Sequence, residues 1–91
     1  MKVIVVGTGR MGQLICARAS QLGHEVLAAG DRLNPGEVPQ AAGQADVIID
    51  FSHPDNLEWI LSLPSQAAIV EGTTGYSQEH LDRLHAAAGH R

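Results

Sequence analysis

The segment with the clearest chemical meaning is Gly7-Thr8-Gly9-Arg10-Met11-Gly12, which fits the pattern G-x-G-x-x-G. In such a loop the first glycine permits a tight turn, and the second lets the backbone approach a pyrophosphate. The third lets the following helix pack closely on the preceding strand. The exposed N–H groups at the start of that helix attract phosphate. The segment predicts dinucleotide binding, although a glycine-rich turn can also be purely structural, and Arg10 either adds charge near the phosphates or lies in solvent.

A second candidate is the pair Asp31-Arg32, because Asp31 lies 24 residues after Gly7 (31 − 7). A carboxylate at that distance accepts hydrogen bonds from the hydroxyls of an adenosine ribose, which favours NAD. A neighbouring guanidinium can pair with a 2′-phosphate, which favours NADP. A solvated pair in a turn is the alternative. We interpret the pair as permitting both NADH and NADPH.

Four apolar runs have the length of strands, and none of them alternates polar with apolar residues. Continuous runs of this kind are typical of parallel strands that are covered on both faces. The runs are Val3–Val6, Val26–Ala29, Val47–Phe51 and Ala67–Val70.

Helical spacing separates most of these runs. A helix is expected from Met11 to Leu22, with Met11, Leu14, Ile15, Ala19 and Leu22 on its apolar face and Gly23 as its cap. Pro54 suits the first position of a second helix that ends before Pro64, and Ser77 suits the N-cap of a third, Gln78–Ala88. The polar segment Gly30–Gln44 reads as a surface loop with one helical turn near Pro39–Ala42.

The order of elements is therefore β-α-β-loop-β-α-β-α. Right-handed crossovers between parallel strands then predict a Rossmann-type doubly wound parallel sheet with helices on both faces. We expect about four strands in the order 3-2-1-4. In such a sheet, ligands bind beyond the carboxyl ends of the strands, where the glycine loop and Asp31 would lie.

Composition limits the function. The chain has 91 residues and a net charge of −4, which fits one domain and gives no reason to expect a nucleic-acid partner. No window is long and apolar enough for a membrane span, and no signal peptide is recognisable, so we expect a cytoplasmic protein. The five histidines have no metal-ligand spacing. The single cysteine, Cys16, fits a reducing compartment and is expected to be packed rather than reactive.

Two further segments narrow the family. Asp46-Val47-Ile48-Ile49-Asp50-Phe51-Ser52-His53-Pro54 and Glu71-Gly72-Thr73-Thr74-Gly75-Tyr76, taken with the G-R-M-G ending of the first loop, resemble 4-hydroxy-tetrahydrodipicolinate reductase (dihydrodipicolinate reductase) of lysine and diaminopimelate synthesis. The resemblance covers essentially the whole chain, and the G-T-T-G segment is more specific than the glycine loop.

The resemblance implies a role for each matching residue. The glycine loop would hold the pyrophosphate of NADPH or NADH, and Asp31 and Arg32 would contact the adenosine ribose. Ser52 would lie along the cofactor. Gly72, Thr73 and Thr74 would border the nicotinamide, with Thr74 nearest a small dicarboxylic substrate. The sequence departs from the family in two places, because many members have one more residue in the first loop and Glu71 replaces a smaller or apolar residue.

The family's substrate-binding histidine and lysine belong to a second domain, and the only lysine here, Lys2, begins a strand. We therefore expect residues 1–91 to be the N-terminal dinucleotide-binding domain, with the C-terminal catalytic domain absent, and to be inactive alone. The edge of the fourth strand would then favour self-association. The alternatives are a non-enzymatic nucleotide-sensing module and the cofactor domain of another NAD(P)-dependent dehydrogenase.

Overall fold

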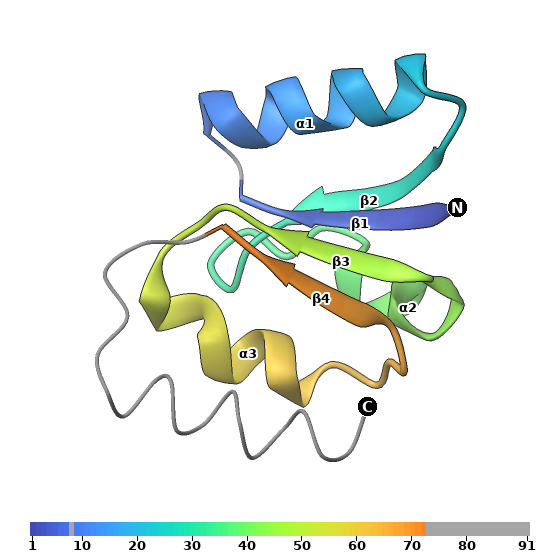
Figure 1. The fold of residues 1–91 in the computed structure, drawn as a ribbon. Coiled ribbons are helices and arrows are strands. Elements are labelled where there is room, and N and C mark those ends of the chain that lie inside the picture. The colour runs from blue at the N-terminus through green and yellow to red at the C-terminus, as the bar shows by residue number, and fades with distance from the viewer. Residues whose placement is uncertain (8, 73–91) are drawn as a thin grey trace.

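The computed structural model describes residues 1–7 and 9–72, which form a parallel four-stranded sheet with α1 on one face and α2 and α3 on the other (Figure 1). The four strands and the helices between them confirm the predicted fold class. The strands are β1 (Lys2–Val6), β2 (Glu25–Gly30), β3 (Val47–Asp50) and β4 (Ala68–Glu71). The helices are α1 (Arg10–Gln21), α2 (Val38–Ala41) and α3 (Leu57–Ser62), with short 3₁₀ turns η1 (Ala42–Gln44) and η2 (Pro54–Asn56). The helix predicted at Gln78–Ala88 lies outside the described residues.

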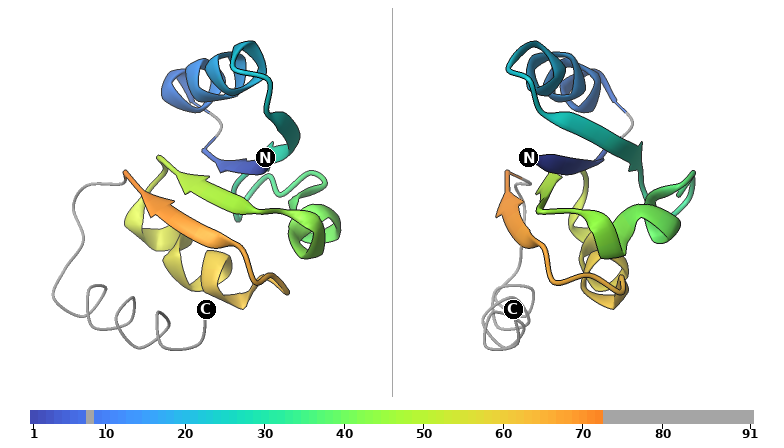
Figure 2. Two further views of the ribbon diagram at one scale, coloured as in Figure 1. Left: turned by 45° about the vertical axis from the view of Figure 1, so that its right-hand side comes forward. Right: turned by 90° about the vertical axis from the view of Figure 1, so that its right-hand side faces the viewer.

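The predicted strand order 3-2-1-4 is wrong. The observed order is β2-β1-β3-β4, and β3 pairs with β1, from Val3 opposite Val47 to Val6 opposite Asp50. The reason lies in burial. β3 is apolar and mostly buried, as an interior strand must be, whereas β2 buries only Gly30 completely and occupies an edge. The segment between them runs along the face of the sheet opposite α1 (Figure 2), and its Val38 belongs to the same core cluster as Ile48 of β3.

The core has two parts because successive residues of β1 point to opposite faces of the sheet. On the side of α2 and α3, one cluster contains Ile4, Val6, Val38, Ala42, Ile48, Ile60, Leu63 and Ala67. On the side of α1, a smaller cluster contains Val3, Val5 and Val47, with Ile15, Cys16 and Ile49 packed against it. Both faces of the central strands are covered, as the continuous apolar runs predicted.

Helix α1 forms where it was predicted, but its buried face is different. Met11, Leu14 and Leu22 are exposed, whereas Gly12 and Ala19 are buried and Ile15 and Cys16 contact the core. The face of α1 that packs on the sheet begins at Gly12, because the helix lies too close to the end of β1 for a larger residue there. Gly23 ends the helical segment with a φ of +87°, which confirms its predicted role as a cap.

Candidate functional site

The carboxyl ends of all four strands meet at one edge of the sheet (Figure 1). Backbone hydrogen bonds join the segments that follow them. The N–H of Gly7 donates to the carbonyl of Gly30 at 3.0 Å, and the N–H of Phe51 donates to that of Val6 at 3.1 Å. The N–H of Gly72 donates to the carbonyl of Asp50 at 2.8 Å. The structure thus brings the described members of the predicted site to one edge, as the doubly wound fold requires.

Two glycines of the first loop are required by close backbone contacts. Gly7 has a φ of +133°, and a Cβ there would lie 2.8 Å from the carbonyl oxygen of Phe51. A Cβ on Gly12 would lie 2.2 Å from the carbonyl oxygen of Gly7. These contacts support the predicted roles of the first and third glycines in the turn and in helix packing.

The middle glycine has a different environment. Gly9 is the N-cap of α1, and a Cβ there would meet no atom of residues 1–7 and 9–72 within 4 Å. The first hydrogen bond of the helix runs from the N–H of Gln13 to the carbonyl of Gly9, so the N–H groups of Arg10, Met11 and Gly12 precede the helical ladder. Arg10 and Met11 are exposed beside this opening. The residues present therefore fit a phosphate group that approaches the backbone here.

The turn after β2 fixes the position of Asp31. Its Oδ1 accepts hydrogen bonds from the N–H groups of Leu33 at 3.0 Å and Asn34 at 2.8 Å. The N–H of Asp31 donates to the carbonyl of Asn34 at 3.1 Å, and a Cβ on Gly30 would lie 2.6 Å from the carbonyl oxygen of Pro35. The Asp31 carboxylate is therefore held in place by hydrogen bonds from the backbone of the turn to which it belongs.

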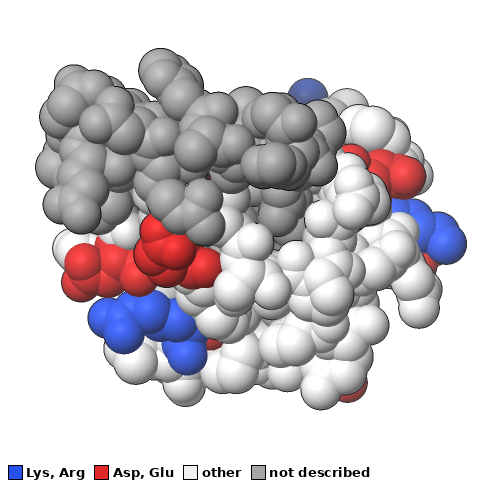
Figure 3. Space-filling model, turned by 90° about the horizontal axis from the view of Figure 1, so that it is seen from below, with Lys and Arg blue, Asp and Glu red and all other residues white. Residues whose placement is uncertain are grey.

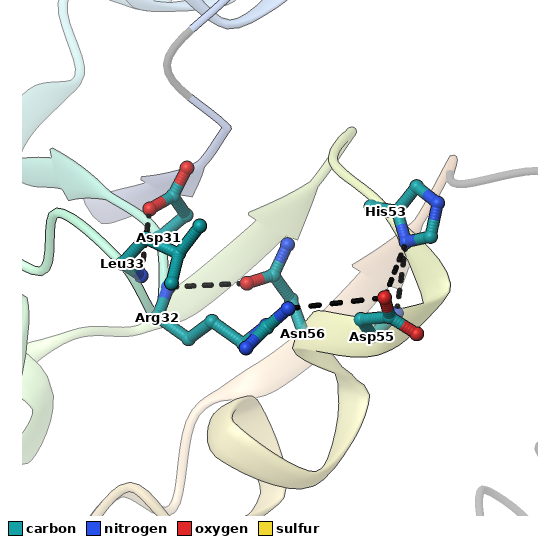
Figure 4. A pocket seen from close by; sticks show the side chains of 6 residues that line it. All are labelled: Asp31, Arg32, Leu33, His53, Asp55 and Asn56. Atoms are coloured by element: carbon teal, nitrogen blue, oxygen red, sulfur yellow. Dashed lines mark hydrogen bonds and ion pairs between the residues drawn. The ribbon is translucent and has the colours of Figure 1, made fainter.

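A cavity of about 220 Å³ lies beside Asp31 (Figure 4). The N–H of Arg32 donates to Oδ1 of Asn56 at 3.1 Å, which joins the turn after β2 to the start of α3. The Arg32 guanidinium lies 3.8 Å from Oδ2 of Asp55. The described residues that line it are Asp31, Arg32, Leu33, His53, Asp55 and Asn56, of which the sequence predicted the first two as site residues.

Ser52 is held by a neighbour that the sequence reasoning also missed as a site residue. Asp50 is completely buried, and its Oδ1 accepts hydrogen bonds from the Ser52 N–H at 3.1 Å and the Ser52 hydroxyl at 2.5 Å. An acidic residue at the end of an apolar strand was the available signal, because a buried carboxylate needs hydrogen-bond partners. The arrangement fixes the loop that follows β3.

Phe51 covers the end of β4. A Cβ on Gly72 would lie 2.2 Å from ring atoms of Phe51, whose side chain is partly exposed. Glu71 is partly buried, as expected for a carboxylate that replaces a smaller residue. Three of the predicted site residues, Thr8, Thr73 and Thr74, lie outside the described residues.

Comparison with known families decides the relationship. Residues 1–90 match the family described as "Dihydrodipicolinate reductase, N-terminus". The chain belongs to this family.

Individual members of the dihydrodipicolinate reductase family agree with that assignment. The chain is 39% identical over 94 residues to 4-hydroxy-tetrahydrodipicolinate reductase of Alkaliphilus metalliredigens, covering 99% of this chain and 38% of the relative. It is 36% identical over 100 residues to the protein of the same name from Natronomonas pharaonis, covering 97% of this chain and 41% of the relative. The chain thus spans about two fifths of the length of these curated relatives.

Cys16 of this reductase-family domain lies on α1 and packs against the core. Burial raises the pKa of the Cys16 thiol, which confirms that it is packed against the core. Within residues 1–7 and 9–72, no group of three or more His, Cys, Asp or Glu side chains is placed to hold a metal ion.

No helix in this part of the chain has the length and apolar character to span a membrane. In Figure 3, basic and acidic side chains of described residues lie next to one another rather than in one broad basic area.

Proposed function

We propose that this chain binds NADPH or NADH as the cofactor-binding part of a 4-hydroxy-tetrahydrodipicolinate reductase, which acts in lysine and diaminopimelate synthesis. The observation that carries the proposal is the open space at Gly9, at the same sheet edge as the cavity beside Asp31. One position suits a pyrophosphate and the other an adenosine ribose. The names and sequences of the relatives support the same reading.

The glycine loop would hold the pyrophosphate through its backbone. The N–H groups at the start of α1 precede the helical ladder and carry the partial positive charge of the helix dipole. Because Gly9 has no side chain, phosphate oxygens can approach these donors. The exposed Arg10 would add positive charge, and Thr8 and Met11 would flank the phosphates.

The adenosine ribose would occupy the cavity between the turn after β2 and the start of α3. Asp31 would accept hydrogen bonds from the ribose hydroxyls, since its turn holds the carboxylate at the wall of the cavity. Arg32 would lie beside the 2′ position. Burying these polar contacts in a preformed cavity would fix the register of the cofactor along the sheet edge.

The nicotinamide would lie near the ends of β3 and β4, with Ser52 along the cofactor and Gly72, Thr73 and Thr74 at the ring. Asp50 would orient Ser52 through its two hydrogen bonds, and Phe51 would shield Gly72 from water. The bound cofactor supplies a hydride, which in a complete reductase would reduce the C=C–C=N system of a cyclic dicarboxylic substrate. This chain's residues would orient the donor.

The remaining parts of the proposal concern the whole protein. Because residues 1–91 span about two fifths of these relatives, we assign substrate binding to the part of the relatives that these residues do not match, and we expect residues 1–91 alone to be inactive. The single cysteine and the biosynthetic role favour the cytoplasm. The outer edge of β4 would favour association between chains.

The test is isothermal titration of the full chain with NADPH and with NADH, followed by an assay with the dicarboxylic substrate of the named relatives. We expect measurable binding of at least one nucleotide and no turnover. Failure to bind either nucleotide would contradict the cofactor-binding role. Turnover by this chain alone would contradict the assignment of substrate chemistry to another part of the protein.

A further inference from the structure

The cavity beside Asp31 has an unusual balance of charge for a site that is to accept a phosphate. Asp31 and Asp55 contribute two carboxylates to its lining, and Arg32 contributes one guanidinium (Figure 4). With His53 neutral, these groups sum to −1 (−2 + 1). The resemblance to the family implies that Asp31 and Arg32 contact the adenosine ribose, and the position of Asp55 changes what Arg32 can do.

The Arg32 guanidinium points away from Asp31 and toward the start of α3 (Figure 4). Its backbone N–H is fixed by the buried side chain of Asn56, and its Nη2 lies 3.8 Å from Oδ2 of Asp55. Both partners are substantially solvent-exposed, so the pair itself is weak. Its importance is positional, because Asp55 places a negative charge beside the cation with which an incoming anion would pair.

His53 does not supply the missing positive charge. Its Nδ1 accepts a hydrogen bond from the Asp55 N–H at 3.2 Å, so the lone pair of that nitrogen is engaged. The same nitrogen lies 3.4 Å from Oδ2 of Asp55, but it cannot accept from the backbone and donate to the carboxylate at once. The hydrogen bond to the backbone uses the Nδ1 lone pair, and Arg32 is the one Lys or Arg side chain among the described residues that line the cavity.

We infer that Asp55 is a specificity-determining residue that makes this chain prefer NADH to NADPH, an inference that rests on the proposed cofactor-binding function. A ribose 2′-hydroxyl donates a hydrogen bond and is compatible with a carboxylate-rich cavity. A 2′-phosphate carries a charge of about −2, meets Asp31 and Asp55, and must displace Asp55 from Arg32. The Arg32 guanidinium, which would otherwise suit the 2′-phosphate of NADPH, is thus partly neutralised by Asp55.

The experiment compares NADH and NADPH binding by isothermal titration at constant pH 8 and low salt, using the full chain and its Asp55→Asn variant. Asparagine keeps the shape of the side chain and removes the charge. We expect the parent to favour NADH and the variant to gain about two- to fivefold in relative affinity for NADPH, the size typical of one exposed charge contact. The gain should shrink in high salt, because screening weakens it.

Two further variants locate the effect. Glu25→Gln removes the same charge from the amino end of β2, outside the cavity, and should leave the NADPH-to-NADH ratio unchanged. Arg32→Gln in the Asp55→Asn background should abolish the gain, because the released guanidinium is its source. Circular dichroism identifies any variant that fails to fold, and Asp55→Ser, which also removes the charge, then replaces Asp55→Asn.

The possible outcomes distinguish the role of Asp55 in selectivity from the proposed cofactor-binding function. If the parent binds NADH and Asp55→Asn leaves the ratio within twofold, the role of Asp55 is refuted while the proposed function stands. If the parent prefers NADPH, the inference is refuted in the same way. If the parent binds neither nucleotide, the proposed function fails and the inference fails with it. A gain that requires Arg32 supports the inference.

Discussion

A Cβ on Gly12 would lie 2.2 Å from the carbonyl oxygen of Gly7, so α1 meets the end of β1 with no space for a side chain. The obstacle is backbone rather than a flexible side chain, so only a shift of the helix could relieve it. This contact sets the distance between α1 and the sheet at the point where the phosphates are proposed to bind.

Replacing Gly12 by alanine should therefore destabilise the domain. We expect a loss of about 1–3 kcal/mol in the free energy of unfolding, the usual cost of overpacking a close contact. Urea denaturation followed by circular dichroism measures the loss. Gly43→Ala is the matched control, because its Cβ would make only an ordinary contact at 3.7 Å with the carbonyl oxygen of Pro64. Equal stability of the Gly12 and Gly43 variants would contradict the packing role.

Gly9→Asp should separate folding from binding. The new side chain has space, and aspartate is a favoured N-cap, so the free energy of unfolding should not fall. Its carboxylate would occupy the place proposed for the pyrophosphate, and we expect nucleotide affinity to fall by more than about tenfold through charge repulsion and loss of the backbone donors. Titration against Gly9→Ala, which adds no charge, checks this. Undiminished binding by Gly9→Asp would place the phosphates elsewhere.

The buried carboxylate of Asp50 should contribute to stability as well as to the site. Asp50→Ala removes the acceptor of two hydrogen bonds from Ser52 and leaves the donors to find other partners, at a cost of about 2–3 kcal/mol. Ser52→Ala removes one donor only and should cost about 1 kcal/mol. Thermal unfolding of both variants and of the double variant gives the coupling. Additive effects would show that the two side chains are energetically independent.

Cys16 should react slowly with alkylating reagents. Burial raises the pKa of its thiol, so less thiolate is present near neutral pH than for an exposed cysteine, and the rate should continue to rise into more alkaline solution. The rate of iodoacetamide labelling between pH 7 and pH 10, compared with the chain in urea, measures this. A folded chain that reacts as fast as the unfolded one at pH 7 would show that the thiol is not protected.

Self-association should involve β4, which is the outermost strand beside β3 in the described sheet and carries the half-exposed Val70. We expect the molar mass from light scattering to rise with protein concentration. Val70→Lys should reduce that rise, because a charge at a strand edge disfavours pairing between chains. A monomer at all concentrations would exclude the association, and an unchanged rise in the variant would place it at another surface.

The strands could be located from sequence because their apolar runs are a local property. Their order could not, because the position of β3 depends on a core cluster that joins Val38 to residues of β1 and β3, which are distant in the sequence. The same distinction applies to the site. The glycine loop and Asp31 follow a spacing that can be read directly, whereas Asp55 and Asn56 become neighbours of Arg32 only when the chain folds.

The contact between Phe51 and Gly72 couples two positions that are far apart in the chain. A side chain at position 72 must displace the Phe51 ring, and because that ring is a partly exposed side chain rather than backbone, Gly72→Ala should cost less stability than Gly12→Ala. A smaller residue at position 51 would free that space and make the same alanine acceptable. The residue at position 51 should therefore decide how readily position 72 accepts a side chain.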